Sequence, residues 1–221
     1  MRAARWFIAA VAIAGVCWVF PLFHVVPLKK AETEKSAGVF NATRFAETFW
    51  TNRLLPSVGT AVKTDVLLPA IQTNAAAAKK KFSRSVGLSE SYFYFLSGTG
   101  RVVSISDDGI SLAMSDNSTN AEILLETGPV FGDAIRDGTG LLNVNDYPNS
   151  QDFNGISAAL DHLVETRVLP KLRQQAKAGT KISFAGCAEV DDESTDLKPL
   201  KVIPVSAAAL TEANGGNRDE K

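Results

Sequence analysis

The pattern of hydrophobic and polar positions separates an apolar run at the start of the chain from everything that follows. Residues 6–28 carry no charged side chain other than His24, and basic residues flank the run on both sides. A helix rises about 1.5 Å per residue, so the run is long enough to cross a hydrocarbon core roughly 30 Å thick. Residues 29–40 are polar and predict a tether. We therefore expect residues 1–28 to be a signal anchor or a signal peptide.

The apolar run admits three interpretations. It can be a cleaved signal peptide with small residues at Ala12–Ala14, a lipoprotein signal that ends at Cys17, or an uncleaved anchor. The apolar segment before Ala12 is short for a cleaved signal peptide, and Val16 stands where a lipoprotein signal carries a small residue. We favour the uncleaved anchor and keep Cys17 as the candidate lipidation residue. An anchor with so short an N-terminal tail is typical of proteins whose folded part lies outside the cytoplasm.

Beyond the tether, apolar residues recur at helical spacing and predict a helical subdomain over residues 41–87. Asn41 or Thr43, Asp65 and Asn74 are candidate N-caps of three helices, because their side-chain oxygens can accept a hydrogen bond from the first free backbone N–H groups of a helix. Gly87 is a natural helix stop.

Two short motifs in the predicted helices resemble each other. TNRLLP (51–56) and ETRVLP (165–170) share Arg, Leu and Pro at the same offsets. A proline within helical periodicity removes a backbone donor, so each motif predicts a kink or a new helix start. Both duplication and a shared packing requirement explain the similarity, and six residues do not decide between them.

From residue 88 onward, the pattern changes to the alternation that is typical of strands. A helix is expected over 150–177, begun by Asn149 and Asp152 as a capping box. The order of helices and strands predicts an α+β fold, and residues 207–221 predict a disordered tail. The expected strands are 91–96, 101–106, 110–115, 121–126, 181–190 and 200–210, with turns at 97–100 and 107–109.

Charge and cysteine content exclude several classes of function. The chain has 23 basic and 24 acidic side chains, so it offers no general attraction to a phosphate backbone and we expect no nucleic-acid partner. Its two cysteines cannot build a disulfide framework or a thiolate metal site. Cys187 lies in a strand-like apolar segment and is expected to be a small buried hydrophobic residue.

The stretch Val130–Gly155 is rich in Gly, Asp and Asn and allows two interpretations. Its glycines suit a long structural loop, which is the interpretation we favour. In the other interpretation it is a polar recognition surface for a ligand or a partner protein. The side chains expected to bind are Asp133, Arg136, Asp137, Asn143, Asn145 and Asp146, with Tyr147 offering a flat apolar face.

Catalytic motifs are scarce, and we expect the protein not to be an enzyme. His162 is predicted on the polar side of its helix, and no nucleophile-elbow sequence accompanies it. The stretch around Asn143–Asp152 lacks the spacing of a calcium loop, so neither a metal nor a cofactor is expected. Asp133 and Asp137 could act as a carboxylate pair in a hydrolase of envelope glycans, and this is the alternative that we keep.

The chain resembles the family of predicted periplasmic lipoproteins known as domain of unknown function 2291, from the anchor to about Ser206. The resemblance lies in FWTNRLLP, YFYFLSGTGRVVSI, TGPVFGDAIRDGTGLLNVNDYPNSQDFN, VLPKLR, KISFAGCAEV and KVIPV. It implies export to the periplasm, membrane attachment and an OB-like antiparallel β-barrel joined to a helical part. The expected order of strands and helix agrees with such a barrel over residues 88–206, with the helix 150–177 inserted in it.

The resemblance also implies a role, because members of the family are often encoded beside sugar ABC transporters. We therefore expect a periplasmic accessory or binding protein held at the inner membrane by its N-terminal segment. A sugar ABC transporter, its binding protein or a small carbohydrate would be its partner. A purely structural envelope protein is a further alternative, and the OB fold alone does not name a ligand.

Overall fold

A computed structural model of the chain describes residues 40–87, 90–147 and 149–210. The chain divides into two units, residues 1–40 and residues 41–221, and the architecture below is that of the second. The expected anchor, Cys17, the tether up to residue 39 and the tail beyond residue 210 lie outside the described residues. No helix within the described ranges has the length and apolar character needed to span a bilayer.

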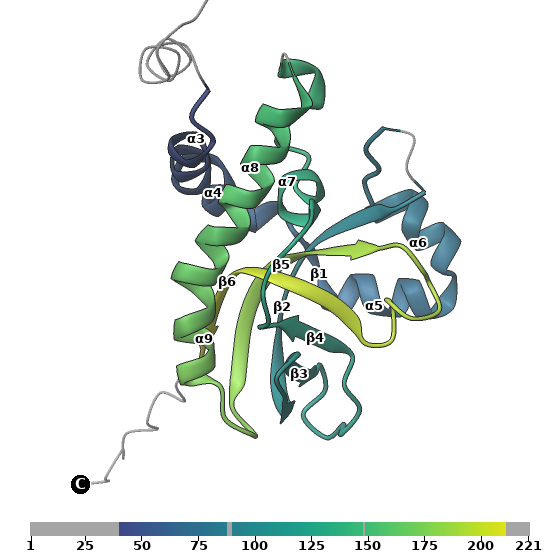
Figure 1. Ribbon diagram of the computed structural model, residues 1–221. Coiled ribbons are helices and arrows are strands. Elements are labelled where there is room, and N and C mark those ends of the chain that lie inside the picture. The colour runs from purple at the N-terminus through teal and green to yellow at the C-terminus, as the bar shows by residue number, and fades with distance from the viewer. Residues whose placement is uncertain (1–39, 88–89, 148, 211–221) are drawn as a thin grey trace, which may run out of the picture. The chain divides into compact units, whose positions relative to one another are not determined.

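The second unit begins with helices, as the spacing predicts (Figure 1). Asn41 and Asn74 are both confirmed as N-caps, because their side chains accept from the backbone N–H of Arg44 at 2.8 Å and of Ala77 at 3.0 Å. Asp65 is not a cap, since its helix already begins at Thr64, and the helix after Asn74 ends at Phe82, before Gly87. The elements are α3 (Ala42–Phe49), the π-helical turn η1 (Trp50–Leu54), α4 (Leu55–Ser57), the 3-10 turn η2 (Val58–Thr60), β1 (Val62–Lys63), α5 (Thr64–Thr73) and α6 (Ala75–Phe82).

The strands pair in a circuit that returns to its first member. β2 pairs with β3, β3 with β4, β4 with β6, β6 with β5, and β5 again with β2. Each of these five strands contributes a side chain that is 0% exposed: Leu96, Leu112, Leu125, Ile182 and Val202. The strands are β2 (Tyr92–Ile105), β3 (Gly109–Ala113), β4 (Ile123–Glu126), β5 (Lys181–Val190) and β6 (Leu200–Ala209).

The strand β2 corrects the sequence prediction, which placed a turn at residues 97–100. The strand runs through this segment without a break, and its glycines serve close packing instead of chain reversal. A Cβ at Gly98 would lie 2.1 Å from Oγ1 of the buried Thr64, at the start of α5. A Cβ at Gly100 would lie 2.9 Å from Cβ of Leu112 in β3. The glycines therefore let a helix and a neighbouring strand approach the β2 backbone.

Two other features differ from the expected antiparallel sheet. β4 pairs with β6 in parallel, and the short β1 pairs with β2 in parallel. Between β4 and β6 the chain passes through helices and through β5, and such a long connection allows two strands to run in the same direction. β6 ends at Ala209, which agrees with the strand expected over residues 200–210 and shows that the tail expected from residue 207 begins too early, because residues 207–209 are still paired with β5.

A long helical segment follows the side of the strands (Figure 1, green). It comprises α8 (Ser150–Leu163), the π-helical turn η4 (Val164–Val168) and α9 (Leu169–Gln175). The expected capping box is confirmed, since Asn149 accepts from the backbone N–H of Asp152 at 2.7 Å and donates to its carboxylate at 2.9 Å. α8 packs against α3, whereas η4 and α9 pack against β6.

The two similar motifs have the same local structure. TNRLLP and ETRVLP each contain most of a π-helical turn, and each proline lies near the start of the α-helical segment that follows it. The kink expected from the prolines is therefore a π turn, which relieves the i to i−4 hydrogen-bond pattern ahead of a residue that lacks an N–H. Arg167 of η4 forms an ion pair with Glu47 of α3, so the two helical segments meet close to both motifs.

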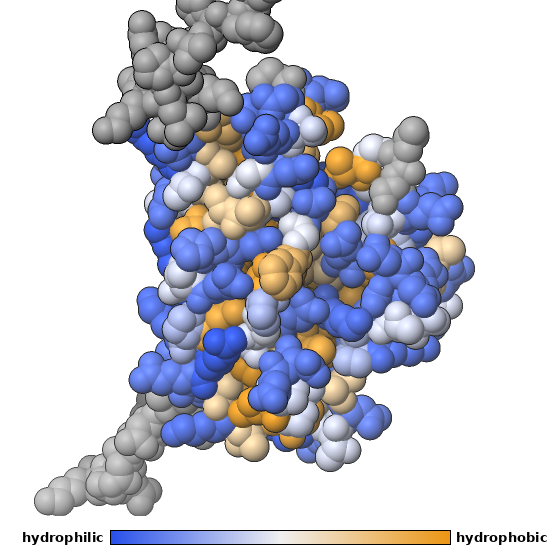
Figure 2. Space-filling model, viewed as in Figure 1, coloured by the Kyte–Doolittle hydropathy of each residue, from blue (hydrophilic) through white to orange (hydrophobic). Residues whose placement is uncertain are grey.

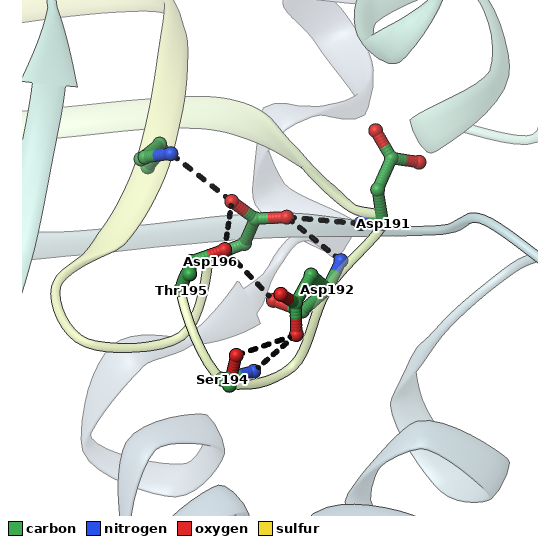
Figure 3. Close-up of polar contacts among 6 residues, drawn as sticks. Asp191, Asp192, Ser194, Thr195 and Asp196 are labelled. Atoms are coloured by element: carbon green, nitrogen blue, oxygen red, sulfur yellow. Dashed lines mark hydrogen bonds and ion pairs between the residues drawn. The ribbon is translucent and has the colours of Figure 1, made fainter.

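Most of the face seen in Figure 2 is hydrophilic, with hydrophobic residues in separate small groups. The loop between β5 and β6 is held by Asp196, whose contacts are drawn in Figure 3. The Asp196 carboxylate accepts from the backbone N–H groups of Asp191 at 3.1 Å and Asp192 at 3.0 Å, and from Nζ of Lys201 at 3.0 Å. Burial raises the pKa of Asp196, but the hydrogen bonds and the lysine outweigh burial and lower it to about 2.

This loop should make the fold sensitive to acid. A carboxyl whose pKa is lowered in the folded state stabilises that state above its unfolded pKa near 3.8, and the contribution is lost as the pH falls toward about 2. We expect Asp196→Asn to reduce the free energy of unfolding by about 1–2 kcal/mol at neutral pH, with the difference from wild type vanishing in acid. Urea titrations at several pH values measure it. Asp107→Asn, in the exposed β2–β3 turn, is the control; a pH-independent difference for Asp196→Asn would contradict the assignment.

Candidate functional site

The Gly, Asp and Asn stretch is not a continuous loop but contains the short helix α7 (Ala134–Gly138), all of whose residues are buried. α7 packs against β2, β5, β6 and α8. Nε and Nη2 of Arg136 each donate to one carboxylate oxygen of Asp137 at 2.7 Å. Nη1 lies 3.0 Å from a carboxylate oxygen of Asp133, and the guanidinium lies 3.9 Å from the ring centroid of Phe153. Arg136 therefore joins α7, the preceding loop and α8.

The ion pair of Arg136 and Asp137 is buried, whereas the sequence predicted both residues on an exposed polar surface. Arg136 is 5% exposed and Asp137 is 4% exposed, and both carboxylate oxygens of Asp137 are occupied by the guanidinium. Burial by itself lowers the pKa of Arg136, but Asp137 and Asp133 raise it, so the guanidinium stays charged. The two residues face one another in the interior and do not form part of an exposed recognition surface.

The other residues of the expected surface lie in a turn before α8. Asn143, Asn145 and Asp146 are exposed, and Asn143 accepts from the backbone N–H of Asn145 at 3.0 Å to start the 3-10 turn η3 (Val144–Asp146). Tyr147 packs edge-on against Phe45, with centroids 5.9 Å apart, and lies 5.2 Å from Phe153. The flat face expected to meet a ligand thus takes part in packing between the turn, α3 and α8.

A pocket of about 450 Å³ opens between the loop before α7 and the helix α8. We call it the acidic pocket, because Asp133, Asp161 and Glu165 all line it. Asp133 accepts from Oγ of Ser157 at 2.8 Å, and Glu165 accepts from the backbone N–H of Val130 at 3.0 Å, so both ends of the loop are fixed to the helix. Of the residues expected to bind a ligand, Asp133 is the one that lines this pocket.

Asp161 differs from the other two carboxylates of the acidic pocket. It is only 6% exposed, and no described residue gives its carboxylate a hydrogen bond or an ion pair. Burial, and to a smaller extent the charges of Asp133 and Glu165, raise its pKa to about 7, although Arg136 acts to lower it. A buried carboxylate without a partner costs free energy, so this residue is unusual in a wall that serves only the fold.

Phe131 stands at the mouth of the acidic pocket and is 79% exposed. The same residue lines a second, smaller pocket of about 220 Å³ together with Glu189 and Lys201. Burial, followed by the charges of Asp191, Asp133 and Asp137, raises the pKa of Glu189 to about 7, although Arg136 acts to lower it. An exposed aromatic ring therefore borders two pockets with carboxyl groups in their walls.

The remaining candidates for chemistry are placed as the sequence predicts. His162 is exposed and contributes to the rim of the acidic pocket. Cys187 is 0% exposed in β5, and burial raises the pKa of its thiol, so it is a buried hydrophobic residue. Among the residues that the structure describes, no three acidic, histidine or cysteine side chains are grouped as metal ligands.

The sequence analysis did not single out Phe131, Asp161 or Glu165. One signal for Asp161 was available: it occupies the apolar face of α8, four residues after Ser157 and next to Leu160, and both of those residues are buried. A charged residue in the apolar stripe of a helix calls for a partner or a function. No comparable signal identifies Phe131, because an isolated aromatic residue in a loop is common.

Comparisons with known proteins agree with this architecture. The chain is similar to an OB-fold protein from Thermotoga maritima whose crystal structure is known, with a TM-score of 0.69 and 25% identity over 78% of this chain and 99% of that one. A comparison with curated proteins found no match. The model of the family described as "Predicted periplasmic lipoprotein (DUF2291)" matches residues 7–208, which confirms the resemblance and supports a periplasmic location with membrane anchoring. The chain is thus an α+β protein with an OB fold that belongs to the family of predicted periplasmic lipoproteins DUF2291.

Proposed function

We propose that the protein is a non-catalytic binding or accessory protein for solute uptake, and that it binds solutes with the acidic pocket and Phe131. Its first 28 residues hold it at the inner membrane, and its partner is a sugar ABC transporter or the transporter's binding protein. The circuit of five strands serves as an OB-type barrel that carries the pocket. Family membership supports the location, and the exposed ring of Phe131 at the mouth of a carboxylate-lined pocket supports the binding role.

The chemistry of the pocket suits a polyhydroxylated solute. The C–H face of a sugar ring packs on an aromatic ring, and sugar hydroxyls donate to carboxylate oxygens. Phe131 supplies such a ring, and Asp133, Asp161 and Glu165 supply acceptors in the same pocket. Both parts are needed, since carboxylates fix the orientation of a ligand while the ring contributes apolar contact.

Removing the ring tests this proposal. We expect the detergent-solubilised full chain to be stabilised by at least one sugar of a monosaccharide panel, and Phe131→Ala to weaken that binding about 10-fold, because a buried apolar contact contributes roughly 1.5 kcal/mol. Thermal shift and calorimetry measure both effects. Ile105→Ala removes another exposed apolar side chain, 52% exposed on β2, and serves as the control. The proposal would be refuted if no sugar stabilised the protein and no transporter or binding protein co-purified with it from membranes.

A second candidate is a hydrolase of envelope glycans. The pair suggested by the sequence, Asp133 and Asp137, is unsuited to it because Asp137 is bound through both oxygens to Arg136. Asp133 and Asp161 share one pocket instead, and the pKa of Asp161 near 7 suits a general acid. A hydrolase should release reducing ends from envelope glycans and lose turnover in Asp161→Asn without loss of folding; unchanged turnover would exclude this pair.

A further inference from the structure

Asp161 places a carboxylate in the acidic pocket that no described residue pairs. Asp161 lies more than nine-tenths buried, lines the pocket, and receives neither a hydrogen bond nor an ion pair from the described part of the chain. Buried carboxylates in folded proteins are otherwise paired, as Asp137 is with Arg136 in the same region. The position of Asp161 therefore points to a partner that comes from outside the chain.

The charges around Asp161 indicate the sign of that partner. Asp133 and Glu165 line the same pocket, and the nearest cation, Arg136, already binds Asp133 and Asp137. Asp133, Asp137 and Arg136 together carry one excess negative charge, and Asp161 and Glu165 add to it when they are ionised. No lysine or arginine lines the pocket. The negative charge of the pocket is thus not compensated by the side chains that line it, and a cationic ligand would compensate it where a neutral or anionic ligand would not.

The pocket also offers apolar contact to the rest of the ligand. Phe131 lines the pocket and is 79% exposed, so its ring can pack on the C–H face of a ligand whose ammonium group binds Asp161. An ammonium group close to the carboxylate of Asp161 would favour the ionised form and offset the rise of its pKa that burial causes.

We infer that the acidic pocket binds a solute that carries a protonated amine, with the ammonium group donating to the carboxylate of Asp161 and Phe131 covering the ligand at the mouth. This inference rests on the proposed binding function and names its ligand class. Combined with the proposed role in sugar uptake, the ligand is an amino sugar: the ammonium occupies the inner end at Asp161, and the hydroxyls meet Asp133 and Glu165.

Matched pairs of sugars test the inference on the detergent-solubilised full chain. The pairs are D-glucosamine with D-glucose, D-galactosamine with D-galactose, and D-mannosamine with D-mannose, titrated by calorimetry near pH 7, where the amines are largely protonated and a substantial fraction of Asp161 is ionised. We expect at least one amino sugar to bind about 10-fold or more tightly than its neutral counterpart, because a charge-assisted hydrogen bond replaces a neutral one. N-acetylation of that amino sugar removes the charge and should remove the preference.

The variant Asp161→Asn has nearly the same shape and cannot carry a charge. It should bind the amino sugar no more tightly than the neutral sugar, whereas Asp107→Asn should behave as wild type. The variant should also stay folded and melt at a higher temperature than wild type above pH 7. A buried carboxyl with a raised pKa destabilises the fold once it must ionise, and asparagine removes that cost.

Each contrary result has a distinct meaning. Equal binding of both members of every pair would overturn the amine inference and leave the proposed sugar-binding function standing. Loss of binding to neutral and amino sugars alike, with no co-purifying transporter component, would overturn both. Calcium chloride alone should not stabilise the protein. Stabilisation by calcium that Asp161→Asn abolishes would overturn the inference in favour of a metal ion.

Discussion

Replacing Arg136 with alanine is expected to lower the free energy of unfolding by about 3–5 kcal/mol, the largest effect of any single substitution proposed for this chain. The guanidinium is 5% exposed and neutralises Asp137, which is 4% exposed. Without it, Asp137 would remain buried and charged and would lose both of the 2.7 Å hydrogen bonds that the guanidinium donates. The stacking over Phe153 at 3.9 Å would also be lost. Urea denaturation of the full chain in detergent measures the change.

Two comparisons show whether burial of the ion pair is the cause. Arg167 also forms an ion pair, with Glu47, but both side chains are 43% exposed, so Arg167→Ala should cost less than about 1 kcal/mol. The double variant Arg136→Met, Asp137→Leu removes both charges together and should recover most of the stability lost in Arg136→Ala. A double variant no more stable than the single one would mean that packing, and not the unpaired carboxylate, dominates.

Gly186→Ala should cost about 3 kcal/mol, because the β5 backbone at this point touches the next strand. A Cβ on Gly186 would lie 2.4 Å from the carbonyl oxygen of Ile203 and 2.6 Å from a methyl carbon of Val202. The position coincides with the register shift between β5 and β6 after Ala185. A backbone carbonyl in a paired strand cannot rotate away, so the strands would have to separate locally.

The matched control for this substitution is Gly128→Ala. Gly128 follows β4, has no neighbouring atom within 4 Å of an added Cβ and does not have a positive φ. We expect its stability to change by less than about 0.5 kcal/mol. Equal losses in the two variants would indicate a general effect of removing glycine, and would contradict the close approach of β5 and β6.

The fold was predictable from the sequence wherever local rules decided it. The caps at Asn41, Asn74 and Asn149 follow from side chains that accept hydrogen bonds near their own residue, and the structure confirms all three. The unbroken course of β2 was not predictable. Gly98 suits a turn on local grounds, and only the approach of Thr64, distant in sequence, shows that the glycine makes room for a helix.

The candidate site shows the same division. The sequence placed Asp133, Arg136 and Asp137 on one polar surface, whereas in the structure Asp133 lines the acidic pocket and the other two are buried. Adjacent charges of opposite sign fit an exposed pair and a buried pair equally well, and the difference depends on β5 and α8 covering them. The exposure of Phe131 likewise depends on how the loop before α7 is fixed to α8 by the hydrogen bond between Val130 and Glu165.

The circuit of strand pairings has a consequence for how the protein can meet others. A strand with unpaired backbone groups along one side can recruit a further strand from another chain, which leads either to aggregation or to recognition by strand addition. Each strand from β2 to β6 pairs with two neighbours, although β6 pairs with β4 and with β5 over different residues. The circuit therefore leaves less free strand edge than an open sheet would, which favours recognition of a partner protein by side chains over extension of the sheet.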